Sequence, residues 1–143
     1  MSTSLFHEWF EQVWNKGDES AIDRLLDPGV ILRDLDGSGG GESRGPDAFK
    51  AHFHRLRSAF PDVHVTVHGA FEMNGYVAGR WTVTGTHTGE GLGFPPTNRK
   101  IEIPGMSFVH VENGRAAEVW DSWDVTGMMH QLGHGSAAAA GAG

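Results

Sequence analysis

Residues 62–89, DVHVTVHGAFEMNGYVAGRWTVTGTHTG, decide the fold of this chain of 143 residues. Apolar and polar side chains alternate on both sides of Asn74-Gly75, and an Asn-Gly pair between alternating stretches is a strong short-range signal for a β-hairpin. Residues 100–124, KIEIPGMSFVHVENGRAAEVWDSWD, repeat the pattern around Asn113-Gly114. Two long hairpins in succession predict a curved antiparallel sheet.

The residues before these hairpins have a helical pattern. Apolar side chains recur at three- and four-residue spacing in 5–16 and 46–60, and a shorter helix is predicted for 18–26. Another short helix is expected for 125–133. About three helices followed by antiparallel hairpins predict an α+β domain, in which the helices cover one face of a bent, cone-shaped sheet and enclose a pocket.

Composition excludes several classes of function. The formal net charge is −7, with 18 acidic and 11 basic residues and no basic cluster, so nucleic acid and anionic membranes are not expected partners. The chain has no cysteine, which fits a cytoplasmic location. Glu8 and Glu11 interrupt the apolar N-terminal stretch, so it is predicted to be neither a signal peptide nor an anchor. We expect one domain over residues 1–133 and a flexible Gly/Ala tail over 134–143.

The alternation of strand side chains sorts the stretch EVWDSWD, residues 118–124, into two faces. Trp120 and Asp124 share one face, and Asp121 and Trp123 share the other. The bulky apolar residues of this region are on the face of Trp120, so this face is predicted to line the interior. The predicted pocket wall comprises His87, Trp81, Trp120, Phe108, Met106, Phe53 and Trp14.

On this assignment, Asp124 and His110 share the interior. A carboxylate under a helical cover loses hydration, which raises its pKa and makes it a usable general acid or base. A neighbouring histidine can donate to an oxyanion or orient the carboxylate. The structural alternative for Asp124 is a helix cap at the end of its strand. If Trp123 lies in the pocket instead, Asp121 becomes the catalytic candidate.

No motif predicts a metal or a cofactor. The histidines of residues 52–54, HFH, and 130–134, HQLGH, lack a third ligand at the spacing that a metal requires. The glycine-rich residues 37–42, GSGGGE, lack the lysine and hydroxyl residue of a phosphate-binding loop. We therefore expect chemistry that the chain's own side chains perform.

Several stretches resemble the SnoaL-like polyketide cyclase family. They are FPDVHVTV at 60–67, GTHTGE at 85–90, GFPPTNR at 93–99 and the pattern W..WD..G...QLG over 120–133, and the resemblance covers about residues 5–133. It implies the cone fold of nuclear transport factor 2-like proteins, often assembled as homo-oligomers through the sheets. Here a homodimer or homotetramer is expected.

The resemblance also implies an activity. Cyclases of this family close a ring by an intramolecular aldol reaction without metal or cofactor. Their acid/base aspartate resembles Asp124 and their assisting histidine resembles His110. The leading hypothesis is such a cyclase or isomerase, with a role in antibiotic biosynthesis and a polyketide-like or polycyclic apolar substrate. The alternatives are a cofactor-independent hydroxylase and a non-catalytic module that binds hydrophobic ligands.

Overall fold

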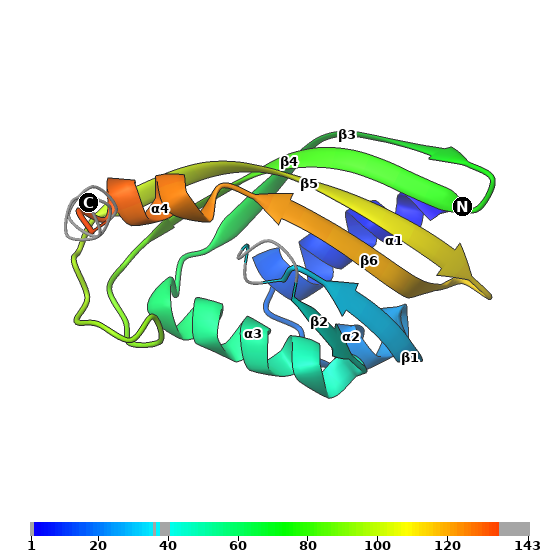
Figure 1. Cartoon of the computed structure of the whole chain (residues 1–143), viewed down its shortest axis with the longest axis horizontal. Helices are drawn as coiled ribbons and strands as arrows, with labels where there is room; N and C mark the ends of the chain where they lie inside the picture. The colour runs from blue at the N-terminus through cyan, green and yellow to red at the C-terminus, as the bar shows by residue number, and fades with distance from the viewer. Residues whose placement is uncertain (1, 36, 38–40, 135–143) are drawn as a thin grey trace.

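The computed structural model describes residues 2–35, 37 and 41–134. Six strands form one sheet in the order β2-β1-β6-β5-β4-β3, which curls over the helices (Figure 1). The strands are β1 Leu26–Arg33, β2 Glu42–Arg44, β3 His64–Met73, β4 Tyr76–Thr86, β5 Lys100–Glu112 and β6 Arg115–Trp123.

Both predicted hairpins are confirmed. Strands β3 and β4 pair antiparallel around Asn74 and Gly75, and β5 and β6 pair around Asn113 and Gly114; all four of these residues have positive φ. Asn and Gly tolerate that backbone region, and the resulting turns match the twist of the strands that they join. Irregularities in register occur between Val67 and Gly69 and between His110 and Val111, and such bulges bend a sheet.

The sheet is mixed and not wholly antiparallel, because β1 runs parallel to β6. Strand β1 begins at Leu26, directly after α2. The sequence predicted that Leu26 is the last residue of that helix, so the prediction was one residue too long. The strand carries Pro28, which cannot donate to a ladder, and the pairing of β1 with β6 is irregular between Leu26 and Ile31.

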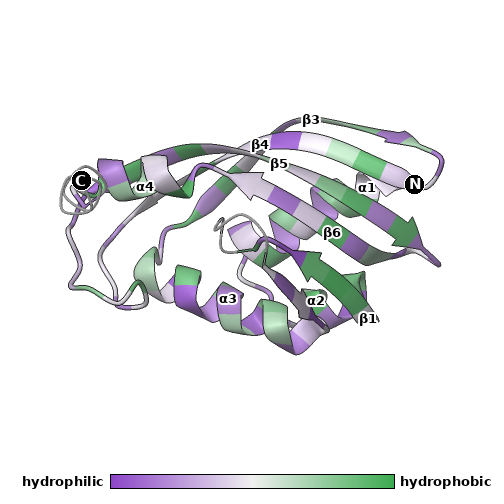
Figure 2. Cartoon of the chain, viewed as in Figure 1, coloured by the Kyte–Doolittle hydropathy of each residue, from purple (hydrophilic) through white to green (hydrophobic). Residues whose placement is uncertain are grey.

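The helices are α1 Ser2–Glu8, the π-helix η1 Trp9–Asn15, α2 Ser20–Leu25, α3 Pro46–Ala59 and α4 Val125–Gln131. The predicted helix over 5–16 is thus a short α-helix that continues into a wider π-helical segment, a form often found at functional sites. Its apolar side chains Phe6, Phe10, Val13 and Trp14 are buried against the sheet. In Figure 2, α3 alternates hydrophobic and hydrophilic residues, and its buried residues include Phe49 and Phe53.

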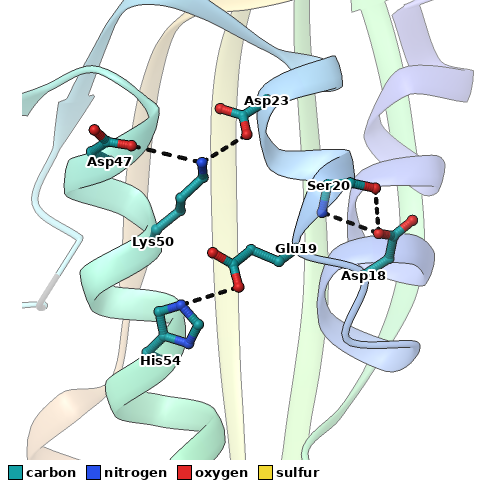
Figure 3. Close-up of polar contacts among 7 residues, drawn as sticks. All are labelled: Asp18, Glu19, Ser20, Asp23, Asp47, Lys50 and His54. Carbon is teal, nitrogen blue, oxygen red and sulfur yellow. Dashed lines mark hydrogen bonds and ion pairs between the residues drawn. The ribbon is translucent and has the colours of Figure 1, made fainter.

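Polar contacts hold α2 against α3 (Figure 3). The ammonium group of Lys50 lies 2.7 Å from a carboxylate oxygen of Asp23 and 3.7 Å from one of Asp47. One turn further along α3, Nε2 of His54 lies 3.2 Å from Glu19 Oε1. These contacts are solvent-exposed, so each stabilises the packing only modestly. They fix the helix that forms the wall of the cone opposite the sheet.

Among the described helices, none combines the length and the apolar character needed to cross a membrane. The predicted cytoplasmic location stays a prediction. The predicted tail over 134–143 lies outside the described residues except for His134, whose ring packs 4.0 Å from that of Phe94.

Candidate active site

The concave face of the sheet and the helices enclose a cavity of about 110 Å³. A cavity holds a water molecule once it offers roughly 10–15 Å³ by the same measure, so the side chains leave room for a ligand. The lining is predominantly apolar and rich in aromatic rings. They come from α1 and η1 (Phe6, Trp9, Phe10, Trp14), from α3 and the residue after it (Phe49, Phe60), from β4 (Trp81) and from β6 (Trp123).

Asp121 is the one carboxylate among the described residues that line this cavity. Its side chain is partly buried between the strands and borders the cavity. Burial raises the pKa of Asp121 to about 6; the hydrogen bond from Ser107 opposes this rise, and the charge of Asp34 adds to it. An acid with a pKa near neutrality can accept a proton at one step of a reaction and return it at another.

Ser107 lies directly opposite Asp121 on the neighbouring strand β5. Its Oγ donates to Oδ1 of Asp121 at 2.6 Å and accepts from Nε1 of Trp81 at 3.0 Å. Three adjacent strands therefore contribute one side chain each to a hydrogen-bonded chain on the inner face. His52 of α3 is a further polar residue of the lining and is 9% exposed.

Asp124 and His110 lie outside the cavity, so their predicted placement is corrected. Asp124 is exposed and caps α4, with Oδ1 accepting from the backbone N–H of Gly127 at 2.8 Å. This is the structural alternative that the sequence left open. His110 stacks on Tyr76 on the convex face, with 4.6 Å between ring centroids.

The predicted pocket wall is partly right. Trp14 and Trp81 border the cavity. Phe53 is buried behind the lining, with its ring 5.6 Å from that of Trp14. His87 is fully buried between Phe60 and Phe94, and its Nδ1 accepts from the backbone N–H of Thr97 at 3.2 Å.

The remaining three predicted wall residues, Met106, Phe108 and Trp120, lie on the convex face. Met106 is 62% exposed and Phe108 is 43% exposed. Phe108 stacks on Tyr76 there, with 5.1 Å between ring centroids, and packs at a tilt against Trp120 at 5.5 Å. The alternation correctly assigned these three residues to one face, but that face is the convex, outer face of the sheet.

The physical reason lies in the cavity itself. Two inner positions of β5, Gly105 and Ser107, are small because Trp81 and the open volume occupy the space above them. A Cβ added to Gly105 would overlap the six-membered ring of Trp81. The sequence named Asp121 only as the alternative that applies if Trp123 lies in the pocket, and both residues do line the cavity. Ser107 and His52 were not predicted. The same alternation places the apolar residues Ile101 and Ile103 on the face of Ser107. Both isoleucines are buried, and following the pattern as far as these two residues would have indicated the correct inner face.

In the described part of the chain, no three His, Cys, Asp or Glu side chains gather in a way that could hold a metal ion.

A curled sheet closed by helices around a cavity with a carboxylate in its wall defines a small-molecule site of the cone-fold class. The model of the family described as SnoaL-like polyketide cyclase matches residues 4–132. The chain belongs to the SnoaL-like polyketide cyclase family.

Individual relatives agree with this assignment. Aklanonic acid methyl ester cyclase DauD from Streptomyces sp. (strain C5) is 28% identical over 116 residues, which are 80% of this chain and 68% of DauD. The crystal structure of IdmH from Streptomyces antibioticus, a proposed polyketide cyclase, is 28% identical with a TM-score of 0.78, covering 92% of this chain and 97% of IdmH. AclR from Streptomyces galilaeus, a proposed hydroxylase, is 27% identical with a TM-score of 0.79, covering 92% and 80%.

Proposed function

We propose that this chain is a cofactor-free polyketide cyclase in which Asp121 is the general acid and base. The observation that supports this most is the position of the Asp121 carboxylate at the wall of an aromatic cavity, hydrogen-bonded to Ser107. At pH 7 a carboxyl group with a pKa of about 6 is mostly ionised, so it is ready to act as a base.

The reaction begins when the ionised Asp121 removes a proton from a carbon next to a carbonyl group. The C–H electron pair becomes an enolate, which attacks a second carbonyl of the same molecule and forms a C–C bond. Protonated Asp121 then returns its proton to the resulting alkoxide. The product is an isomer of the substrate with one more ring, and no oxidant or reductant takes part.

The lining favours a flat, apolar substrate. Indole rings of Trp9, Trp14, Trp81 and Trp123 offer large faces for stacking and for burial of apolar surface. His52 lies on α3 and lines the same cavity as Asp121. We assign to it the contact with a carbonyl or enolate oxygen of the substrate, a role that a histidine can perform as a hydrogen-bond donor.

Product analysis tests this function. Purified protein is incubated with aklanonic acid methyl ester, the compound in the name of the relative DauD, and the products are resolved by liquid chromatography and mass spectrometry. The expected product has unchanged mass and one additional ring, and Asp121→Asn, the matched inactive control, leaves the substrate unconverted. Binding without conversion would overturn the enzyme proposal and favour the ligand-binding module.

A hydroxylase is the second candidate, because AclR matches this chain as well as IdmH does. In that reaction Asp121 would deprotonate an aromatic substrate, which would itself reduce molecular oxygen. The same assay separates the two reactions, since a product heavier by one oxygen atom together with oxygen consumption contradicts the cyclase.

We also propose that the chain self-associates through the convex face of the sheet, as a homodimer or homotetramer. Four large apolar residues there are strongly exposed: Phe71 (69%), Met73 (67%), Met106 (62%) and Phe108 (43%). Exposed apolar patches of this kind commonly mark protein interfaces. Light scattering of the purified protein gives the mass of the assembly, and a monomer at micromolar concentration would contradict this proposal.

A further inference from the structure

The hydrogen-bonded chain behind Asp121 has only one possible direction. The indole N–H of Trp81 is a donor and has no acceptor site, so Oγ of Ser107 must accept at the 3.0 Å contact. A serine hydroxyl carries one proton, and the 2.6 Å contact with Oδ1 of Asp121 is where it goes. Trp81 therefore donates to Ser107, and Ser107 donates to Asp121.

This direction makes the two oxygens of Asp121 inequivalent. Oδ1 accepts a short, charge-assisted hydrogen bond when the carboxylate is ionised. Oδ2 receives no hydrogen bond from any residue that the structure describes. When Asp121 takes up a proton, Oδ2 can hold it while the hydrogen bonds from Trp81 to Ser107 and from Ser107 to Oδ1 stay in place. A proton on Oδ1 would instead point at the Ser107 hydroxyl, which already donates to that oxygen.

The surrounding residues hold this arrangement in place. Trp81 lies opposite Gly105 in the sheet, and the absence of a side chain at that position lets the indole ring lie over β5. Phe10 packs against the indole from η1, with 5.6 Å between ring centroids. Trp81 is 8% exposed and Ser107 is 6% exposed, so bulk water does not compete for either contact.

We propose that Ser107 and Trp81 are positioning residues of the reaction: they commit Oδ1 of Asp121 to a fixed hydrogen bond, so that Oδ2 is the oxygen that exchanges a proton with the substrate. This inference rests on the proposed role of Asp121. Neither residue touches the reacting atoms in this account. They set the orientation and the basicity of the group that does.

The first test is a titration that needs no substrate. The carboxyl carbon of Asp121 is followed by NMR against pH in wild-type protein and in Ser107→Ala, Ser107→Thr and Trp81→Phe. Ser107→Ala removes the donor that stabilises the anion, so the pKa should rise by about one unit or more. Ser107→Thr keeps the hydroxyl and should restore a value near that of the wild type, and Trp81→Phe should shift it upward by less.

The second test is the pH dependence of the cyclisation rate in the same variants. With Ser107→Ala, the fall in the cyclisation rate on the acid side should shift to higher pH by the same amount as the pKa of Asp121 rises. Merely structural damage would instead lower the rate by one factor at every pH. Ser122→Ala, which removes a hydroxyl from the opposite face of β6, is the matched control and should change neither readout.

The outcomes separate this inference from the proposed function. An unchanged pKa of Asp121 in Ser107→Ala overturns the role of Ser107, whether or not the protein turns over substrate. An unchanged pKa of Asp121 in Trp81→Phe would show that Trp81 has no positioning role. Shifted titrations in a protein that converts no substrate would instead refute the proposed function.

Discussion

Replacing Asp121 by Asn should stabilise the protein while abolishing its activity. The folded pKa of about 6 lies above the ordinary value of 3.8, so folding forces a carboxylate into an unfavourable environment at neutral pH. Since each unit corresponds to about 1.4 kcal/mol, the full cost is up to about 3 kcal/mol. Asn matches the shape of Asp and keeps an oxygen for Ser107, and it carries no charge.

The sign of the pH dependence follows from linkage. Below pH 3.8 both the folded and the unfolded wild type hold the proton, so the cost is absent. It appears as the pH rises from 3.8 and is complete above about 6. The advantage of Asp121→Asn in the free energy of unfolding should therefore grow from about 0.5 kcal/mol at pH 4 to about 3 kcal/mol at pH 8.

Denaturant unfolding followed by tryptophan fluorescence at several pH values measures this difference, and in thermal unfolding it corresponds to roughly 10 °C at pH 8. Asp124→Asn controls for the loss of one negative charge next to the same strand and keeps an oxygen to cap α4. If the stability difference between Asp121→Asn and wild type is constant with pH, the carboxyl group of Asp121 does not have a raised pKa and the reasoning fails.

Three further outcomes are expected. The cyclisation rate of the wild type should fall as the pH drops through about 6, because Asp121 then holds the proton that it must remove from the substrate; a rate that is flat from pH 5 to 8 would argue against this base. Asp124→Ala should cost about 1 kcal/mol of stability through the lost cap of α4, with the rate unchanged, as measured by unfolding and by initial rates. Phe108→Glu should reduce the mass of the assembly in light scattering, because it places a charge in the proposed interface; an unchanged mass would point to another face.

Local chemistry explains why so much of the fold could be predicted. An Asn-Gly pair between alternating stretches specifies its own turn, and both hairpins followed from it. The pairing of β1 with β6 joins residues about 90 positions apart, such as Ile31 and Glu118. No local pattern encodes such a contact, so the parallel pair was not foreseen.

On β5 and β6, the size of the apolar side chains is a poor guide to which face of the sheet lies inside. Phe108 and Trp120 are predicted to lie inside from the sequence because large apolar residues usually fill a core. In this fold the interior keeps a cavity and the ring of Trp81, so the inner positions of β5 next to them, Gly105 and Ser107, are small, while Phe108 and Trp120 pack against each other on the convex face. The choice between Asp121 and Asp124 depended on that assignment alone, since the two carboxylates stand on opposite faces by alternation.

Initial rates of two variants show whether Asp121 performs the proton transfer. Asp121→Asn and Asp124→Asn are assayed beside the wild type with the same test substrate at pH 8, where the base is ionised, after unfolding experiments have shown that both are folded. We predict a loss of about 10²- to 10⁴-fold for Asp121→Asn and an unchanged rate for Asp124→Asn. A fully active Asp121→Asn protein, or a large loss confined to Asp124→Asn, would contradict the account.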